Sequence, residues 1–89
     1  MDMMADQKKV LRLLKTARGQ LDGIVRMVEE DRYCIEISQQ VMATGAILDR
    51  VNRDILEAHL RHCVRDAASE AEREEKIEEF VRALERILK

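Results

Sequence analysis

Hydrophobic residues recur every three or four positions along most of the chain, a spacing that predicts three amphipathic helices and an all-α fold. The first helix is expected over about residues 5–29, the second over about 32–65 and the third over about 70–88. We expect residues 1–89 to form one domain, a three-helix protomer. The wide apolar stripe of the first helix comprises Val10, Leu13, Leu14, Ala17, Leu21, Ile24, Val25 and Val28.

The second helix is the longest, and the chain is organised around it. Asp31 is its expected N-cap, after a short turn that begins at Glu29. Helices joined by so short a turn are normally antiparallel neighbours, so the first two helices should form a hairpin. The apolar positions of the second helix, in alternating steps of three and four, have the pattern of a seam between antiparallel helices. They are Ile37, Val41, Thr44, Leu48, Val51, Ile55 and Ala58.

The third helix is predicted by a new start signal. Beyond Asp66 the apolar pattern lapses, and Ser69 with Glu72 has the spacing of a reciprocal capping pair. The helix that follows has an apolar side made of Ile77, Phe80, Val81, Leu84, Ile87 and Leu88.

Three candidate metal ligands lie on the second helix. Cys34 falls in its first turn, where exposed amides and the helix dipole make a thiol reactive. His59 and Cys63, four residues apart, project from one face near the other end. Cys34 precedes His59 by 25 residues, roughly 37 Å along a straight helix, so Cys34 cannot reach the pair within one chain. Two antiparallel copies that cross near Leu48, with Gly45 allowing close approach, would complete two equivalent sites.

Composition also favours an oligomer. A chain of 89 residues buries only about 60 to 65% of the surface that its unfolded form exposes. One Tyr, one Phe, 46% hydrophobic residues and 38% charged residues are typical of helical subunits that share a core.

No apolar run is long enough for a membrane span and no signal-peptide pattern opens the chain, so we expect a cytoplasmic protein. There, two cysteines indicate metal or redox chemistry more than a structural disulfide.

The net charge is only −2, but the charges are unevenly placed. Residues 7–26 contain six basic residues against Asp22 alone, whereas residues 66–79 contain seven acidic residues against Arg73 and Lys76. The basic face of the first helix fits contact with DNA phosphates, and it fits equally a solvated surface balanced by the acidic third helix. No helix-turn-helix, basic-zipper or zinc-finger pattern is present, so base-reading residues cannot be assigned.

Two thiolates and one imidazole form a soft site of low coordination number, which suits copper(I) better than hard cations. Zinc is the main rival, and it would need a fourth ligand such as water or Glu79. Tyr33 and an acidic residue of the third helix are candidate outer partners of the ligands. A lone cysteine or histidine in a small helical protein is more often a packing or surface residue, so the assignment depends on all three converging. His62 is expected to point away from the His59–Cys63 pair, toward solvent. The N-terminal methionines are not included among the candidate ligands.

Two segments of the chain carry a specific resemblance to a known family. The segments LLKTARGQLDGIVRMVEEDRYC and NRDILEAHLRHC resemble the copper-sensitive operon repressor family, the CsoR and RcnR group of small all-helical bacterial regulators. The resemblance covers residues 8–88. The spacing of Cys34, His59 and Cys63 is similar to that of the copper-sensing branch.

The resemblance implies that two protomers form an antiparallel four-helix bundle and that such dimers pair into a homotetramer. It implies a repressor that binds operator DNA without metal. Copper(I), one ion per protomer, would bridge Cys34 of one chain with His59 and Cys63 of the other, and copper-efflux genes would then be transcribed. A copper chaperone that donates the metal is a further expected partner.

The resemblance also assigns roles to residues around these ligands. The family's outer-shell tyrosine and glutamate correspond to Tyr33 and Glu79. Its operator-contacting basic residues correspond to Lys15, Arg18 and Arg50, to which we add Arg12 and Arg53.

Other branches of the family differ at the ligand positions. A nickel or cobalt sensor is expected to carry histidine in place of Cys63 and a further histidine near the N-terminus, which the opening MDMMADQ lacks. A formaldehyde sensor is expected to lack the second thiol. A sensor of persulfides or other reactive sulfur would use Cys34 and Cys63 but would not require His59, whose presence favours copper.

A reactive thiol on a helical protein is also compatible with two other classes of function. A thiol enzyme would use Cys34 as a nucleophile activated by a partner's histidine, but nothing supplies an oxyanion hole or a substrate pocket, so we expect no enzyme. A purely structural helical oligomer would tolerate alanine at all three ligand positions without a change in metal or DNA binding.

Overall fold

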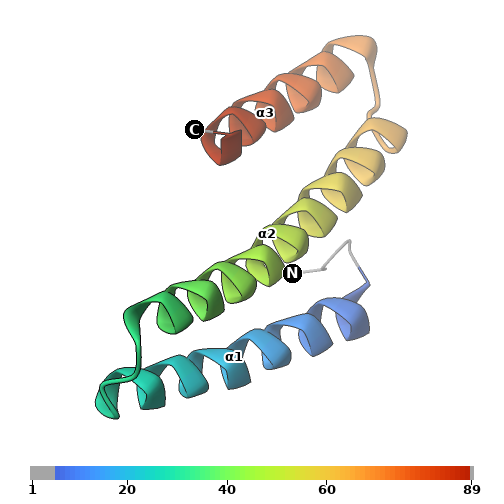
Figure 1. The fold of residues 1–89 in the computed structure, drawn as a ribbon. Coiled ribbons are helices and arrows are strands. Elements are labelled where there is room, and N and C mark those ends of the chain that lie inside the picture. The colour runs from blue at the N-terminus through green and yellow to red at the C-terminus, as the bar shows by residue number, and fades with distance from the viewer. Residues whose placement is uncertain (1–5, 89) are drawn as a thin grey trace. The chain divides into compact units, whose positions relative to one another are not determined.

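The computed structural model describes residues 6–88, which fold into three helices: α1 (Gln7–Glu29), α2 (Cys34–Arg65) and α3 (Glu70–Leu88) (Figure 1). The all-α class is therefore confirmed for the described residues. The expected start of the first helix near residue 5 lies outside them, and α2 begins two residues later than the expected residue 32. The described chain forms two compact units, residues 6–53 and residues 54–88.

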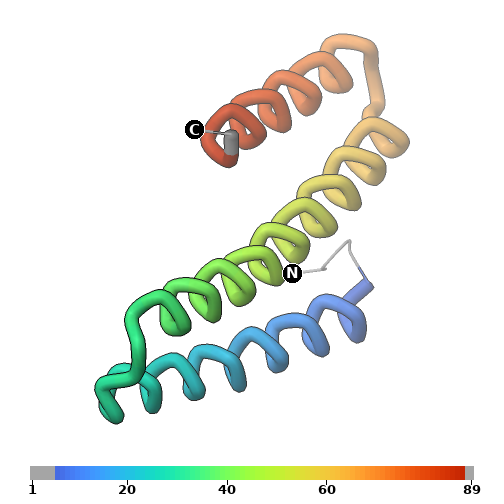
Figure 2. Tube along the Cα trace, viewed as in Figure 1, coloured from blue at the N-terminus to red at the C-terminus, as the bar shows by residue number. Residues whose placement is uncertain are grey.

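The first unit is an antiparallel hairpin of α1 and the first part of α2 (Figure 2). Its buried residues follow at intervals of seven: Val10, Ala17 and Ile24 on α1, and Thr44 and Val51 on α2. A seven-residue interval keeps side chains on one side of a helix, so these five form the contact between the two helices. Asp6 starts α1, because its side chain accepts a hydrogen bond of 3.2 Å from the Lys9 N–H.

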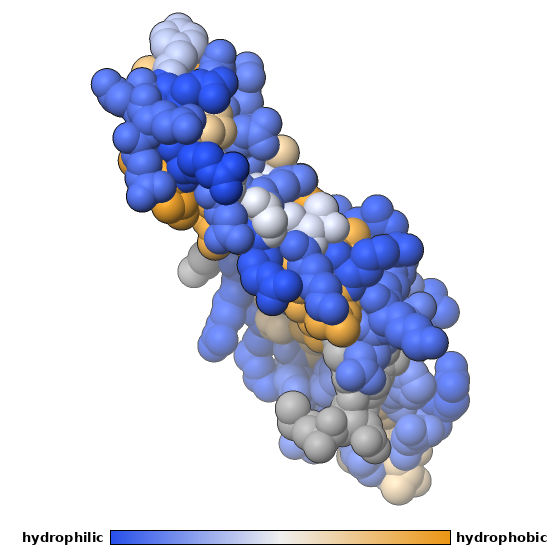
Figure 3. Space-filling model, turned by 90° about the horizontal axis from the view of Figure 1, so that it is seen from below, coloured by the Kyte–Doolittle hydropathy of each residue, from blue (hydrophilic) through white to orange (hydrophobic). Residues whose placement is uncertain are grey.

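The remaining apolar residues of the hairpin reach the surface. Within the α2 series, Val41 and Leu48 are 52% and 48% exposed, although Thr44 and Val51 are buried. The α1 stripe divides in the same way, with Leu14, Leu21, Val25 and Val28 exposed. Figure 3 shows hydrophobic side chains at the surface among hydrophilic ones. Each helix of the hairpin therefore uses one half of its apolar stripe inside the unit and leaves the other half uncovered.

The link between α1 and α2 is a Schellman motif, a hydrogen-bonded C-terminal helix cap. The Arg32 N–H donates to the Met27 carbonyl at 3.0 Å, and the Asp31 N–H donates to the Val28 carbonyl at 3.1 Å. Asp31 has a φ of 54°, the left-handed conformation that this motif requires. Asp31 therefore ends the first helix.

The prediction that Asp31 is the N-cap of α2 is wrong. Tyr33 immediately precedes the helix, and its carbonyl accepts the first helical hydrogen bond from the Ile37 N–H at 3.2 Å. Asp31 is two residues too early, because the turn needs it in the left-handed conformation. Cys34 is nevertheless in the first turn of α2, as expected.

In the second unit, α3 begins at the predicted cap. The Ser69 hydroxyl accepts a hydrogen bond from the Glu72 N–H at 3.1 Å. The Glu72 carboxylate accepts a hydrogen bond of 3.1 Å from the Ala68 N–H, whereas the reciprocal pattern would have it accept from the Ser69 N–H. The capping is therefore reciprocal but displaced by one residue on the carboxylate side.

None of the helices within residues 6–88 combines the length and the hydropathy that a membrane crossing requires.

Candidate metal centre

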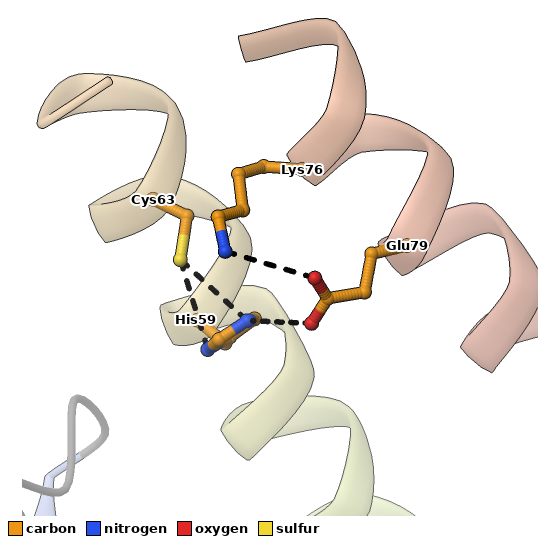
Figure 4. A network of polar contacts seen from close by, with 4 residues as sticks. All are labelled: His59, Cys63, Lys76 and Glu79. Carbon is orange, nitrogen blue, oxygen red and sulfur yellow. Dashed lines mark hydrogen bonds and ion pairs between the residues drawn. The ribbon is translucent and has the colours of Figure 1, made fainter. Parts of the chain in front are cut away.

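His59 and Cys63 form a close pair one turn apart on α2 (Figure 4). The Cys63 Sγ lies 3.5 Å from His59 Nε2 and 3.8 Å from His59 Nδ1. Both side chains are partly buried, and they project from the same face because residues four apart are neighbours on a helix. The two donor groups that the spacing predicted to lie together are therefore together.

Glu79 of α3 contacts the imidazole from the opposite helix. Its Oε1 lies 3.6 Å from His59 Nε2, and its Oε2 lies 3.8 Å from Lys76 Nζ (Figure 4). Each distance exceeds that of a strong hydrogen bond and the side chains are partly exposed, so both are weak polar contacts, and the one with His59 is an ion pair only when the imidazole is protonated. Glu79 is thus an acidic residue of the third helix that contacts His59, and its role as an outer partner of a metal ligand stays a prediction.

Cys34 lies at the other end of the same helix. It is the first residue of α2 and is exposed with a free thiol, whereas Cys63 stands two residues before the last residue of α2. Among the described residues, histidine, cysteine and carboxylate side chains form no cluster of three or more that would hold a metal ion. Within the described residues of a single chain, the His59–Cys63 pair therefore has no third histidine, cysteine or carboxylate that would complete a metal site with it.

Tyr33 is adjacent to Cys34, and its side chain is 66% exposed. Its backbone has the capping role described above, which is independent of the phenol. The role of the phenol as an outer partner of a metal ligand stays a prediction.

The residues predicted to contact DNA all lie in the hairpin unit, and all are exposed: Arg12, Lys15, Arg18, Arg50 and Arg53. None of these five forms an ion pair with another described residue. A shallow depression on α1 is lined by Lys8, Leu11, Arg12, Lys15 and Thr16. The charges of the five predicted DNA-contacting residues are therefore available to a polyanion, which is the property that phosphate contact requires.

Sequence reasoning missed two contacts. Lys76 lies three residues before Glu79, a spacing that brings opposite charges together on a helix and would have identified the pair. The Thr44 hydroxyl donates to Gln20 Oε1 at 2.9 Å across the hairpin. That contact carries no sequence signal, because it depends on the alignment of two helices.

The donor set fits a soft metal ion. A thiol and an imidazole held one turn apart offer two ligands of the kind that copper(I) and zinc accept. A second thiol, such as Cys34 of another copy, would complete a three-coordinate copper(I) site, whereas zinc would require one donor more.

Comparison with known proteins places these features among bacterial regulators. A sequence profile described as metal-sensitive transcriptional repressor matches residues 6–86. The copper-sensing transcriptional repressor CsoR of Mycobacterium tuberculosis (strain ATCC 25618 / H37Rv) is 40% identical over 83 residues, which are 93% of this chain and 70% of that protein.

Two solved structures share the fold. The copper-sensing repressor CsoR with Cu(I) from Geobacillus thermodenitrificans NG80-2 has a TM-score of 0.81 and 35% identity, over 92% of this chain and 85% of that one. The nickel-responsive transcriptional regulator InrS has a TM-score of 0.77 and 35% identity, over 97% of each chain. The two structures are named for different metals at equal identity, so these two likenesses by themselves do not distinguish copper from nickel.

Proposed function

Since the chain belongs to the family of metal-sensitive transcriptional repressors, we propose that it is a copper(I)-responsive repressor. It binds operator DNA in its metal-free state and releases the DNA when copper(I) binds, so that copper-efflux genes are expressed. This function implies that the protein acts in the cytoplasm, where its DNA lies.

The observation that carries the proposal is the His59–Cys63 pair, with 3.5 Å between Sγ and Nε2, on the same helix as an exposed Cys34. The proposed ligands of each copper(I) ion are His59 and Cys63 of one chain and Cys34 of the partner subunit. This assignment uses one ion per protomer and two equivalent sites per dimer. Copper(I) contributes an affinity for soft, low-coordinate sites that hard cations do not share.

The uncovered apolar residues of the hairpin support the dimer that this site needs. Val41 and Leu48 of α2 and Leu21, Val25 and Val28 of α1 are all about half exposed or more. In the proposed antiparallel four-helix bundle a second hairpin covers these residues. Burying each such side chain contributes about 1.5 to 3 kcal/mol at most, so the set is large enough to drive association. The proposed homotetramer is a dimer of such dimers.

The contact between Glu79 and His59 supports a role for the carboxylate in fixing the tautomer of the imidazole that binds the metal. A carboxylate beside Nε2 accepts a hydrogen bond from an imidazole that carries its proton on that nitrogen, and so it favours this tautomer over the one protonated on Nδ1. The lone pair of Nδ1, 3.8 Å from the Cys63 Sγ, is then the one available to a metal. Tyr33, next to Cys34, is the proposed outer partner at the other side of the site.

The exposed cations of the hairpin are the proposed DNA contacts: Lys15, Arg18 and Arg50, with Arg12 and Arg53 as additional candidates. Metal binding releases the DNA only if the metal prefers the DNA-free form of the protein. A change from almost fully bound to almost fully released requires a preference on the order of 10⁴-fold. A copper chaperone is the proposed source of the metal.

A mixed-dimer experiment tests the shared site. The variants Cys34→Ala and Cys63→Ala each lack a ligand in both sites of their own homodimer. In a mixed dimer, one site loses both cysteines, whereas the other keeps Cys34 of one chain and the His59–Cys63 pair of the other. Anaerobic copper(I) titration against a competing chelator should give no tight binding for either variant alone and one site per mixed dimer after both are unfolded and refolded together.

The mixed-dimer result and two further measurements separate the alternatives. A site within one chain predicts that mixing restores nothing, which would refute the proposal. A reactive-sulfur sensor that uses Cys34 and Cys63 predicts that His59→Ala keeps its full response to persulfide and that copper(I) does not release the DNA. Nickel(II) titration of the wild type, with DNA release measured by fluorescence anisotropy, tests the nickel alternative that the InrS likeness raises.

A further inference from the structure

Lys76 and His59 contact the two different oxygens of one carboxylate. Lys76 Nζ is 3.8 Å from Glu79 Oε2, and His59 Nε2 is 3.6 Å from Glu79 Oε1 (Figure 4). Lys76 and Glu79 lie one turn apart on α3, whereas His59 comes from α2. Both oxygens of Glu79 therefore already face a nitrogen within the chain.

We propose that Lys76 determines the metal specificity of this site by holding Glu79 against His59 and out of the metal's ligand set. The inference rests on the proposed function, in which His59 and Cys63 bind the metal. It adds a role for a residue outside the proposed ligand set, and it explains how a site with a carboxylate nearby can favour a monovalent ion.

The choice between copper(I) and zinc depends on the number and kind of ligands. Copper(I) is satisfied by two or three soft donors, whereas zinc normally takes four donors and accepts a carboxylate oxygen among them. Glu79 is the carboxylate that contacts His59, so it is well placed to supply such an oxygen. Restraining Glu79 therefore costs copper(I) nothing and withholds a ligand from zinc.

Lys76 restrains Glu79 through position and through charge. Its ammonium group occupies the side of Oε2, the oxygen that His59 does not contact. It also offsets the negative charge that would attract a divalent ion more strongly than a monovalent one, since the Coulomb energy scales with the charge of the ion. Without Lys76, Oε2 has no ion-pair partner among residues 6–88, and the carboxylate is free to rotate toward a metal.

The test compares zinc and copper(I) affinities, each measured anaerobically on the full-length protein against a competing chelator. Lys76→Met should raise the zinc affinity by about tenfold and the copper(I) affinity by less than about threefold. Lys76→Arg, which keeps the charge near Glu79, should retain the wild-type ratio. Arg86→Met removes a charge from an exposed position of the same helix seven residues beyond Glu79, and it should also leave the ratio unchanged.

A second background tests whether Lys76 acts through Glu79. In a Glu79→Gln protein, adding Lys76→Met should change the ratio by less than about threefold, because the amide is a poor metal ligand. A wild-type ratio in Lys76→Met, or an undiminished change in the Glu79→Gln background, would overturn the inference. The proposed function fails separately, if the wild type does not bind copper(I) tightly or if His59→Ala leaves that binding intact.

Discussion

Thr44 donates a hydrogen bond of 2.9 Å to Gln20 Oε1 and so links the middle of α2 to α1 within an apolar contact. Thr44 is only 7% exposed, and Ala17 and Val51 are among the other buried residues of the hairpin. Thr44→Val keeps the shape and removes the hydroxyl, and it should lower the free energy of unfolding by about 1 kcal/mol. Urea unfolding at fixed protein concentration measures this change. Thr44→Ser, which keeps the hydroxyl, is the control, and a valine variant as stable as wild type would show that the hydrogen bond contributes nothing.

Asp31 offers a stabilising substitution, because it holds a φ of 54° in the turn after α1. A side chain in the left-handed region costs roughly 1 kcal/mol relative to glycine, although aspartate tolerates it better than most residues. Asp31→Gly should therefore raise the free energy of unfolding by about 0.5 to 1 kcal/mol. Asp31→Ala, which gains no freedom at this φ, should not be stabilised, and equal stability of the two variants would contradict the account of this turn.

Gly45 distinguishes a free α2 from one that packs against its copy. A Cβ added there meets no atom within 4 Å in the single chain. If that side stays open, Gly45→Ala raises helix stability by about 1 kcal/mol. If two α2 helices cross at this residue, the added methyl group weakens the dimer by about 1 to 3 kcal/mol.

We expect the second result, seen as a higher dimer dissociation constant in sedimentation equilibrium. Gly19→Ala is a matched control, since a Cβ at that position of α1 also meets no atom within 4 Å. Tighter association of the Gly45→Ala protein would place the crossing elsewhere.

The salt dependence of operator binding reports on the basic residues of the hairpin. If Lys15 contacts a phosphate, Lys15→Ala should reduce the slope of log affinity against log salt concentration by about one. The copper(I) affinity of the DNA-free protein should not change. Arg61→Ala is the control, because Arg61 is engaged with Glu57 at 2.8 Å in the other unit. An equal loss of slope in both variants would indicate general electrostatics rather than contact at Lys15.

The features that could be predicted from sequence are those set by neighbours along the chain. Ser69 and Glu72 identified the start of α3, because a cap depends on residues within one turn. His59 and Cys63 were paired correctly for the same reason, since a four-residue spacing fixes their common face.

The features that sequence could not supply depend on conformation or on a second helix. Asp31 suits both an N-cap and a left-handed turn residue, and only the hydrogen bonds of Arg32 and Asp31 back to α1 decide between them. The apolar series of α2 was identified, but periodicity does not say which half faces α1. Thr44 and Val51 do so, while Val41 and Leu48 do not.

The length of α2 has a consequence for how the proposed sensor responds in a cell. The helix runs unbroken from Cys34 to Arg65, so one chain carries all three proposed ligands, with Cys34 at the first residue of the helix and the His59–Cys63 pair near its last. Tight metal binding then becomes a property of chain concentration, because it is lost when the protein is diluted below the point at which subunits associate. A cell that makes too little of this repressor would be insensitive to copper even though every chain is correctly folded.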